Sequence, residues 1–343
     1  MSRRLKVGII GTGSIAQTVH IPNYIRNKDR VELVAVCDID IQKAKECAHK
    51  FDIPFYFSNY EDMLNQVDLD AVSVCTPNKF HTEATIKSLL SGCHVLCEKP
   101  PAITHEEAKR MQEIAEKTGK ILTYGFHYRY SQEVQTLKKF IDSKELGEIY
   151  TIKVCALRRR GIPNWGVFTN KELQGGGPLI DIGVHMLDTA LYLMGYPNPD
   201  IILASTYQKI GNKKGIGDWD WEKFSVEDFA IGMIKFKNGA TLILETSFAA
   251  NIQKDKMQVS LLGDKGGADL FPLRIYQEKH DVLIDVSPVH TKDIKPRDAE
   301  IDDFISCCLS GIQPFSTPKE GAILQRILEN FYLSSHLNKS IKF

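Results

Sequence analysis

The stretch VGIIGTGSIA, residues 7–16, decides the fold. An apolar run ends at Gly11, and Gly11, Gly13 and Ala16 form a G-x-G-x-x-A pattern where a helix would begin. The first glycine permits a tight turn, the second lets the backbone approach a pyrophosphate, and the alanine lets helix and strand pack closely. The phosphates would lie at the helix N-terminus, where free N–H groups and the helix dipole favour anions. The predicted cofactor contacts in this turn are Gly11, Thr12, Gly13, Ser14 and Ile15.

An acidic residue follows at the distance that such a turn requires. Asp38 comes directly after the apolar run VELVAVC and 22 residues after Ala16. A carboxylate at this position accepts a hydrogen bond from a ribose 2′-hydroxyl. No arginine lies within the next few positions to hold a 2′-phosphate, so NAD is favoured over NADP. The alternative interpretation of Asp38 is a solvated acidic turn.

The spacing of apolar residues divides the chain into two domains. Over residues 5–124, short apolar runs alternate with amphipathic helical patterns, which predicts an α/β fold with a doubly wound parallel sheet of the Rossmann type. The later runs EDFAIGMIKF and ATLILETSFA alternate residue by residue and meet at Asn238-Gly239, a hairpin signal. We therefore expect a dinucleotide-binding domain at 1–125 and an α+β domain with a mostly antiparallel sheet at 126–343. The last helix of the chain could pack back on the first domain.

Two further segments come at the ends of predicted parallel strands, where ligands bind in such sheets: CTPNKFH and CEKPP. Pro100 forces Lys99 out of helical geometry and is compatible with a cis bond, which would fix the direction of the lysine. An isolated lysine is usually an exposed ammonium, but the ligand edge of the sheet favours a role in the site. The remaining predicted cofactor contacts are Cys75, Thr76, Pro77, Asn78, His81, Glu98, Lys99 and Arg129.

An apolar helix after three glycines carries a polar stripe. In GGGPLIDIGVHMLD, residues 175–188, Asp181, His185 and Asp188 are four and three residues apart, which puts them on one helical face. Such a stripe is either a satisfied structural network or an active site. The glycines would allow close approach of the backbone to a ligand, and Pro178 suits a first helical turn.

The composition excludes several classes of protein. The chain is 43% hydrophobic and 25% charged, and 43 basic residues balance 43 acidic ones, so no charge argument favours nucleic acid or a membrane surface. No apolar run approaches the ~18 residues of a membrane span. The eight cysteines show neither a disulfide framework nor a zinc pattern. We expect buried reduced thiols, no metal site and a cytoplasmic location.

Five segments together, GTGSIA, CTPNKFH, CEKPP, GFHYRY and DIGVHMLD, resemble in order and spacing the Gfo/Idh/MocA oxidoreductases. The resemblance covers nearly the whole chain. It implies hydride transfer between a nicotinamide cofactor and a hydroxyl of a cyclic polyol such as a sugar or an inositol. It also implies a large open sheet in the second domain, through which homodimers or homotetramers form. The catalytic trio that it assigns is Lys99, Asp181 and His185.

Each residue of this trio suits one part of the chemistry. His185 would take the hydroxyl proton as the hydride leaves, because the reference pKa of histidine is about 6.5. Lys99 would stabilise the developing alkoxide, and Asp181 would orient the imidazole or bind a neighbouring hydroxyl. We expect Asp188 to make a structural hydrogen bond instead.

The region after the predicted strand IYTIKVCAL would meet the substrate. The expected substrate contacts are Lys99, Arg159, Arg160, Asn164, Trp165, Asp181 and His185. The basic cluster 158–160 is equally compatible with an exposed strand end, and two inward arginines would indicate a phosphorylated or acidic sugar. Two other functions are considered. One is a relative that cleaves glycosides through transient oxidation by NAD. The other is a non-catalytic NAD-binding protein, which the intact trio disfavours.

Overall fold

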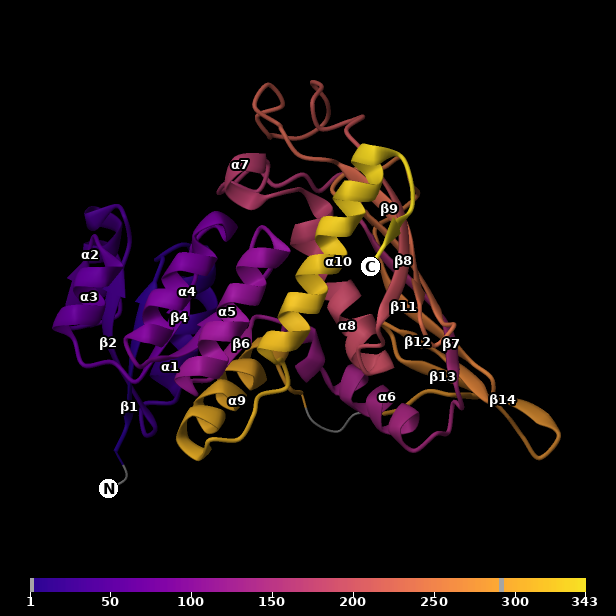
Figure 1. The fold of residues 1–343 in the computed structure, drawn as a ribbon, viewed down its shortest axis with the longest axis horizontal. Coiled ribbons are helices and arrows are strands. Elements are labelled where there is room, and N and C mark those ends of the chain that lie inside the picture. The colour runs from indigo at the N-terminus through magenta and orange to yellow at the C-terminus, as the bar shows by residue number, and fades with distance from the viewer. Residues whose placement is uncertain (1–2, 290–292) are drawn as a thin grey trace. The chain divides into compact units, whose positions relative to one another are not determined.

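The computed structural model describes residues 3–289 and 293–343, and these form two compact units. The first unit comprises Met1–His127 and Arg297–Gln325, and the second comprises Tyr128–Pro296 and Arg326–Phe343. Each unit is built around its own sheet (Figure 1). Helix α10 (Pro318–Leu337) contributes residues to both.

The first unit contains a six-stranded parallel sheet with the order β3-β2-β1-β4-β5-β6. Its strands are β1 (Leu5–Ile10), β2 (Val31–Cys37), β3 (Phe55–Phe57), β4 (Ala71–Val74), β5 (His94–Cys97) and β6 (Leu122–Tyr124). Strands β1, β4 and β5 are buried along most of their length, which explains their nearly continuous apolar sequences. The order reverses between β1 and β4, the switch point at which such sheets bind dinucleotides. The predicted Rossmann-type sheet is confirmed.

Helices connect and cover these strands. They are η1 (Ala16–His20, a π-helical turn), α1 (Ile21–Arg26), α2 (Ile41–Lys50), α3 (Tyr60–Gln66), η2 (Asn78–Phe80), α4 (His81–Leu90), α5 (His105–Thr118) and α9 (Pro296–Ser310). Helix α5 shows how the sequence sets its own limits. Thr104 and Glu107 form a reciprocal capping box at its start, and Gly119, with a φ of 66°, ends it.

The second unit contains a nine-stranded sheet with the order β14-β13-β12-β11-β7-β10-β9-β8-β15. Its strands are β7 (Ile149–Leu157), β8 (Pro199–Tyr207), β9 (Phe229–Phe236), β10 (Thr241–Ser247), β11 (Lys256–Gly263), β12 (Gly266–Leu270), β13 (Arg274–Lys279), β14 (Val282–Val286) and β15 (Ile341–Lys342). Only the β7–β10 pair is parallel among these strands. The hairpin at Asn238-Gly239 joins β9 to β10 as predicted, so the mostly antiparallel sheet is confirmed.

The helices of this unit pack on one face of the sheet. They are η3 (His127–Tyr130), α6 (Gln132–Asp142), α7 (Lys171–Gln174), η4 (Leu179–Gly183) and α8 (Val184–Met194), of which α6, η4 and α8 contact the strands (Figure 1). On the opposite face, Leu203, Met233 and Ile243 are cross-strand neighbours. Leu203 is 49% exposed and Met233 41%. This face therefore presents apolar side chains to solvent.

One edge of the sheet is covered by the end of the chain. The N–H groups of Ala204 and Thr206 in β8 donate to the side-chain oxygens of Ser334 and Ser335 in α10, at 2.9 and 2.8 Å. Strand β15 pairs with the first half of β8. The N–H groups of Ala204 and Thr206 and the first half of β8 thus have partners within the chain on this side of the strand.

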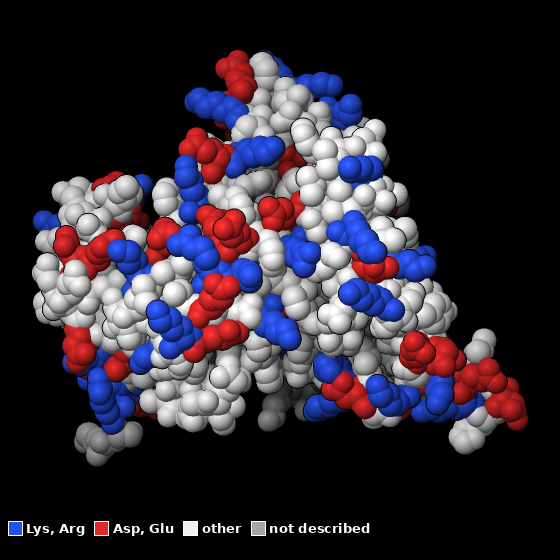
Figure 2. All heavy atoms as spheres, in the orientation of Figure 1, with Lys and Arg blue, Asp and Glu red and all other residues white. Residues whose placement is uncertain are grey.

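The surface and the thiols agree with the composition. On the face that Figure 2 draws, acidic and basic side chains are interspersed rather than gathered by sign. All eight cysteines are free. Within residues 3–289 and 293–343, no helix has the length and hydropathy needed to cross a membrane, and no three His, Cys, Asp or Glu side chains are grouped as metal ligands.

Candidate functional site: a dinucleotide turn and a polar helix

The glycine-rich turn after β1 is shaped by the loop that follows β4. Gly11 has a φ of 93°, and a Cβ there would lie 2.7 Å from the carbonyl carbon of Cys75, so no side chain fits. Gly13 is exposed, and a Cβ built on it would meet nothing within 4 Å. The backbone at the start of the following helix is therefore open to an incoming anion.

Asp38 lies beside this turn and is held by it. The backbone N–H and the hydroxyl of Thr12 both donate to Asp38 Oδ2 at 2.9 Å, and the N–H of Asp40 donates to Oδ1 at 3.1 Å. A carboxylate offers about four acceptor positions, so one remains for a ribose hydroxyl. We call the open turn at residues 11–13 the anion cradle. This cradle, next to the fixed carboxylate of Asp38, fits NAD.

The two loops after β4 and β5 are tied together by a histidine. His81 is fully buried, with Nδ1 2.8 Å from the carbonyl oxygen of Pro100 and Nε2 2.9 Å from that of Thr76. Burial lowers the pKa of His81, although both carbonyl oxygens favour the protonated ring. The predicted cofactor contact at His81 is thus replaced by a structural link between the loops. The Lys99–Pro100 bond is cis, the geometry with which the sequence was compatible.

A buried polar network reaches the backbone of Lys99. Glu98 Oε2 accepts the N–H of Lys99 at 3.2 Å, and Oε1 lies 3.1 Å from His20 Nε2. His20 Nδ1 lies 3.1 Å from the hydroxyl of Ser73, which Tyr24 also contacts at 2.7 Å. Burial opposes ionisation of Glu98, but the hydrogen bond and charge of His20 outweigh it and lower the pKa of Glu98 to about 2. Sequence reasoning missed this network, because His20 is 78 residues from Glu98.

In the second unit, Asp181 lies in η4 and His185 in the first turn of α8. His185 is 8% exposed, and its ring packs edge-on against Tyr128 with ring centres 5.6 Å apart. Asp181 is partly exposed. Asp181, the first position of the polar stripe, therefore retains access to solvent, whereas His185 at the second position is largely buried.

The third position of the stripe is structural. Asp188 is 1% exposed and accepts two hydrogen bonds from Arg129, at 2.9 Å from Nε and 2.6 Å from Nη2. The hydroxyl of Tyr196 donates to Asp188 as well. The expected structural role of Asp188 is confirmed. Arg129, predicted as a cofactor contact, is fully buried in this ion pair, and a ligand arriving from solvent has no exposed guanidinium surface to touch.

The glycines at 175–177 come before the helix that carries Asp181 and His185, which we call the polar helix. Two of these glycines pack closely against other parts of the protein. A Cβ on Gly176 would overlap the hydroxyl of Tyr332, and a Cβ on Gly177 would overlap the carbonyl oxygen of Glu227. Gly175, with a φ of 83°, ends α7. The expected approach to a ligand at this run is therefore corrected for Gly176 and Gly177, which pack against side chain and backbone.

The basic cluster braces a loop. Arg159 Nη1 donates to the carbonyl oxygen of Gln253 at 3.0 Å, and Arg160 Nη1 donates to that of Ala250 at 3.0 Å. Both arginines remain partly in contact with solvent. Asn164 is exposed and Trp165 is 59% exposed, so these two side chains are free to meet a ligand from solvent.

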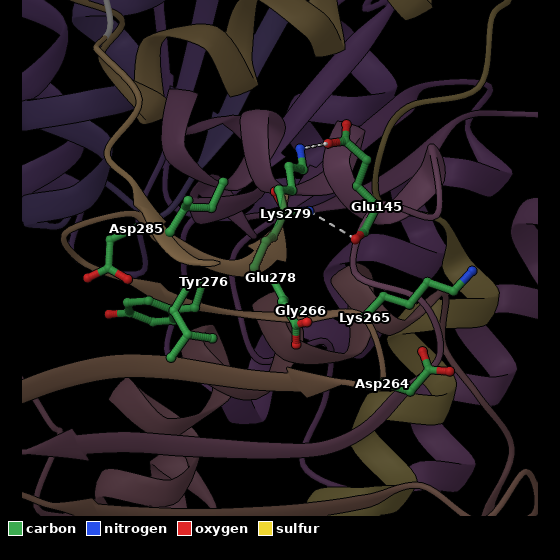
Figure 3. A pocket seen from close by; sticks show the side chains of 11 residues that line it. Glu145, Asp264, Lys265, Gly266, Tyr276, Glu278, Lys279 and Asp285 are labelled. Atoms are coloured by element: carbon green, nitrogen blue, oxygen red, sulfur yellow. Dashed lines mark hydrogen bonds and ion pairs between the residues drawn. The ribbon is translucent and has the colours of Figure 1, made fainter. Parts of the chain in front are cut away.

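A hollow of about 800 Å³ in the second unit lies elsewhere. Residues of β12, β13 and β14 line it together with Glu145, whose carboxylate is 3.7 Å from Lys279 Nζ (Figure 3). None of the predicted site residues lines it. The hollow opens widely to solvent and gives no support to a second catalytic centre.

Comparisons with known proteins identify the family. Residues 5–126 match the model of the oxidoreductase family with an NAD-binding Rossmann fold, and residues 134–269 match the GFO/IDH/MocA C-terminal domain. D-glucoside 3-dehydrogenase of Escherichia coli (strain K12) is 43% identical over 99% of this chain and 98% of its own length. Glucose-6-phosphate 3-dehydrogenase of Bacillus subtilis (strain 168) is 33% identical over 76% of this chain and 72% of its own.

The fold is also shared with solved structures. Levoglucosan dehydrogenase in complex with NADH superposes with a TM-score of 0.87 at 21% identity, over 99% of both chains. The anion cradle, the carboxylate of Asp38 and the polar helix thus occur in a chain that matches both domain models along most of its length. The chain belongs to the Gfo/Idh/MocA family of NAD-dependent oxidoreductases.

Proposed function

We propose that this protein oxidises the C3 hydroxyl of a D-glucoside to a ketone with NAD. The observation that carries the proposal is the 43% identity to a D-glucoside 3-dehydrogenase over 99% of the chain. The presence of Lys99, Asp181 and His185 supports catalysis rather than cofactor binding alone.

The chain supplies proton transfer and charge stabilisation. A secondary alcohol loses a hydride from carbon and a proton from oxygen, which leaves a ketone. Bound NAD supplies the hydride acceptor. His185 takes the hydroxyl proton, and the ammonium of Lys99 donates a hydrogen bond to the oxygen as it gains negative charge. Asp181 accepts a hydrogen bond from the imidazole or from a neighbouring hydroxyl.

The arginines support a neutral substrate. A sugar phosphate needs guanidinium groups that converge on it. Arg159 and Arg160 already donate to backbone carbonyl groups of the loop 250–253. We therefore expect neutral glucosides to be better substrates than glucose 6-phosphate, with Asn164 and Trp165 as contacts.

Formation of NADH with a panel of substrates tests the function. Methyl D-glucosides, glucose, glucose 6-phosphate and myo-inositol are supplied with NAD, the absorbance of NADH is followed, and the position of the ketone is read by NMR. We expect the highest kcat/KM with a glucoside and a ketone at C3. Glycoside cleavage without net NADH would contradict the proposal and support the glycoside-cleaving alternative.

Two variants test the assigned roles. His185→Ala should lower kcat about 10²- to 10⁴-fold because the general base is lost, and Lys99→Ala about 10²- to 10³-fold because alkoxide stabilisation is lost. Affinity for NADH, measured by fluorescence titration, should stay within a few-fold of wild type. Lys117→Ala and His336→Ala, both at exposed positions, are the matched controls. Unchanged turnover in either site variant would rule out the role of that residue.

We also propose that the protein forms a dimer or tetramer through the open face of the nine-stranded sheet. The exposed apolar side chains of Leu203 and Met233 on this face support an interface with a second copy of the chain. The eight free cysteines support a reducing compartment, the cytoplasm, as its location.

A further inference from the structure

Glu227 precedes β9 and places its carboxylate at the start of the polar helix. It is 8% exposed. Oε2 accepts the N–H of Gly177 at 2.9 Å, and Oε1 accepts the N–H of Leu179 at 3.2 Å. The hydroxyl of Tyr332, from α10, donates to Oε1 at 2.9 Å. One buried carboxylate therefore joins the first helical turn to the sheet and to the C-terminal helix.

Other backbone groups of this first turn also have partners within the second unit. The N–H groups of Ile180 and Asp181 both donate to the carbonyl oxygen of Gly177, at 3.1 and 3.0 Å. Pro178 has no N–H, and its carbonyl oxygen accepts the hydroxyl of Thr246 at 3.1 Å. The N–H groups at the start of a helix lack partners within the helix. Here Glu227 supplies two of the missing acceptors, and its negative charge suits the helix N-terminus.

We propose that Glu227 is a positioning residue, which fixes the direction of Asp181 and His185 by holding the turn from which their helix starts. This inference rests on the proposed function. The backbone of Asp181 is bonded to Gly177, whose N–H is held by Glu227, and His185 follows one helical turn later. A small rotation of this turn would displace both side chains.

Glu227 is itself held firmly. The next residue, Asp228, is 1% exposed, and its Oδ2 accepts the N–H groups of Lys209 and Gly211 at 2.7 and 2.8 Å. The backbone N–H of Asp228 donates to the carbonyl oxygen of Tyr207 at the end of β8, and its carbonyl oxygen accepts the N–H of Phe248, directly after β10. The carboxylate that holds the helix thus has a rigid base in the sheet.

A carboxylate is required here and an amide does not replace it. Gly177 and Leu179 donate to different oxygens of Glu227, so both oxygens must be acceptors. A glutamine carries one oxygen and one NH₂ group, and in either orientation the NH₂ faces a backbone N–H. Glu227→Gln therefore keeps the size of the side chain and breaks one of the two bonds.

The test uses the full-length protein with Glu227→Gln and a matched carboxylate variant. Asp269→Asn is the control, because Asp269 accepts hydrogen bonds from Ser260 and Tyr276 in the same sheet and does not contact the helix. For each protein we measure kcat and KM with a methyl D-glucoside, affinity for NADH, circular dichroism and Tm. A second readout is the rate at which diethyl pyrocarbonate modifies His185, followed by mass spectrometry.

In Glu227→Gln that remains folded at the assay temperature, we expect kcat to fall 10- to 100-fold, NADH affinity to stay unchanged, and modification of His185 to speed up several-fold. Asp269→Asn should match wild type in kcat. A folded Glu227→Gln with wild-type kcat overturns the inference and leaves the proposed function intact. If Glu227→Gln does not fold, Tyr332→Phe is measured instead, because it removes the hydroxyl that donates to Glu227. A kcat lowered 2- to 5-fold in this variant supports the inference, and an unchanged kcat overturns it.

Failure of the proposed function is recognised separately. If the wild-type protein reduces NAD with none of the substrates, the proposed function fails and the modification rate of His185 decides the inference. Faster modification in Glu227→Gln then supports positioning by Glu227, and an equal rate overturns it.

Discussion

Asp38 is held in place by Thr12 and Asp40, so its carboxylate is aimed before any cofactor binds. Replacing Asp38 with Ala removes an acceptor for the ribose hydroxyl and a charge that repels a 2′-phosphate. A hydrogen bond to a charged group contributes about 1.5–3 kcal/mol. We therefore expect NAD to bind about 10- to 100-fold more weakly and the preference over NADP to shrink, as measured by titration with both reduced cofactors.

Asp40→Ala is the matched control for this prediction. Asp40 is exposed and accepts the N–H groups of Gln42 and Lys43 at the start of α2. Its loss should cost about 1 kcal/mol of helix stability and leave the ratio of NAD to NADP affinity unchanged. A wild-type protein that binds NADP more tightly than NAD would contradict the role given to Asp38.

At the residue scale, the sequence reveals those site residues whose partners lie close to them along the chain. Gly11, Gly13 and Asp38 could be found because their spacing along the chain is itself the signal. Glu227 could not, because its partners are Gly177 and Tyr332, 50 and 105 residues away. The ion pair of Arg129 could not be found for the same reason: no pattern in the sequence pairs it with Asp188, 59 residues later.

At the scale of elements, the run 175–177 limits what the polar helix tolerates. Gly177→Ala would push a methyl group into the carbonyl oxygen of Glu227. Overpacking against well-fixed groups costs about 1–3 kcal/mol or more. We expect a lower free energy of unfolding in urea and a kcat reduced at least 10-fold, because the turn that carries Asp181 must move.

Gly195→Ala separates this effect from a general cost of replacing glycine. Gly195 ends α8 with a φ of 73°, and nothing lies within 4 Å of its added Cβ. Alanine there should cost about 1 kcal/mol of backbone strain and leave kcat unchanged. Equal losses of kcat in the two variants would contradict a specific role for the turn at Gly177.

The elements themselves were largely predictable, with one type of exception. Apolar alternation correctly indicated β9 and β10, and the Asn238-Gly239 signal correctly placed the hairpin between them. The π-helical turns η1 and η4 were not foreseen, because apolar spacing does not distinguish one extra residue in a turn from a regular helix. Both turns stand at candidate ligand-binding segments.

At the scale of the whole molecule, buried histidines make stability depend on pH. Burial lowers the pKa of His127 to about 3 and also lowers the pKa values of His81 and His94. In the unfolded chain these histidines bind protons below about pH 6.5, whereas in the folded chain burial keeps them neutral to lower pH. The free energy of unfolding therefore decreases as pH falls below about 6.5. For His127 this loss amounts to about 1.4 kcal/mol per pH unit below pH 6.5. Glu227 acts in the opposite direction, because burial raises its pKa.

We therefore expect the free energy of unfolding to fall between pH 6.5 and 5, as measured by urea titrations at several pH values. His127→Gln should reduce the slope by about one proton. His336→Gln, at an exposed position, should leave the slope unchanged. A stability that stays constant over this range would contradict the burial of neutral histidines.

The proposed oligomer is a second property at this scale. Met233→Lys places a charge between Leu203 and Ile243 on the open face of the sheet. If a second copy covers this face, the charge is buried there and the assembly should dissociate, which light scattering during size-exclusion chromatography detects. Leu283→Lys is the control, since Leu283 is 86% exposed and lies in β14, at the opposite border of the sheet from Leu203 and Met233. An unchanged mass for Met233→Lys would contradict this interface.

The serines at the end of α10 have a consequence for how such an assembly can grow. Because Ser334, Ser335 and β15 occupy the backbone groups of β8, another chain cannot extend the sheet strand by strand at that border. A strand of another copy is therefore kept from β8 and could add to the sheet only beyond β15 or at the opposite border, where β14 pairs with β13 alone. Two hydroxyl groups and a two-residue strand thus protect one border of the sheet against fibre-like addition of strands.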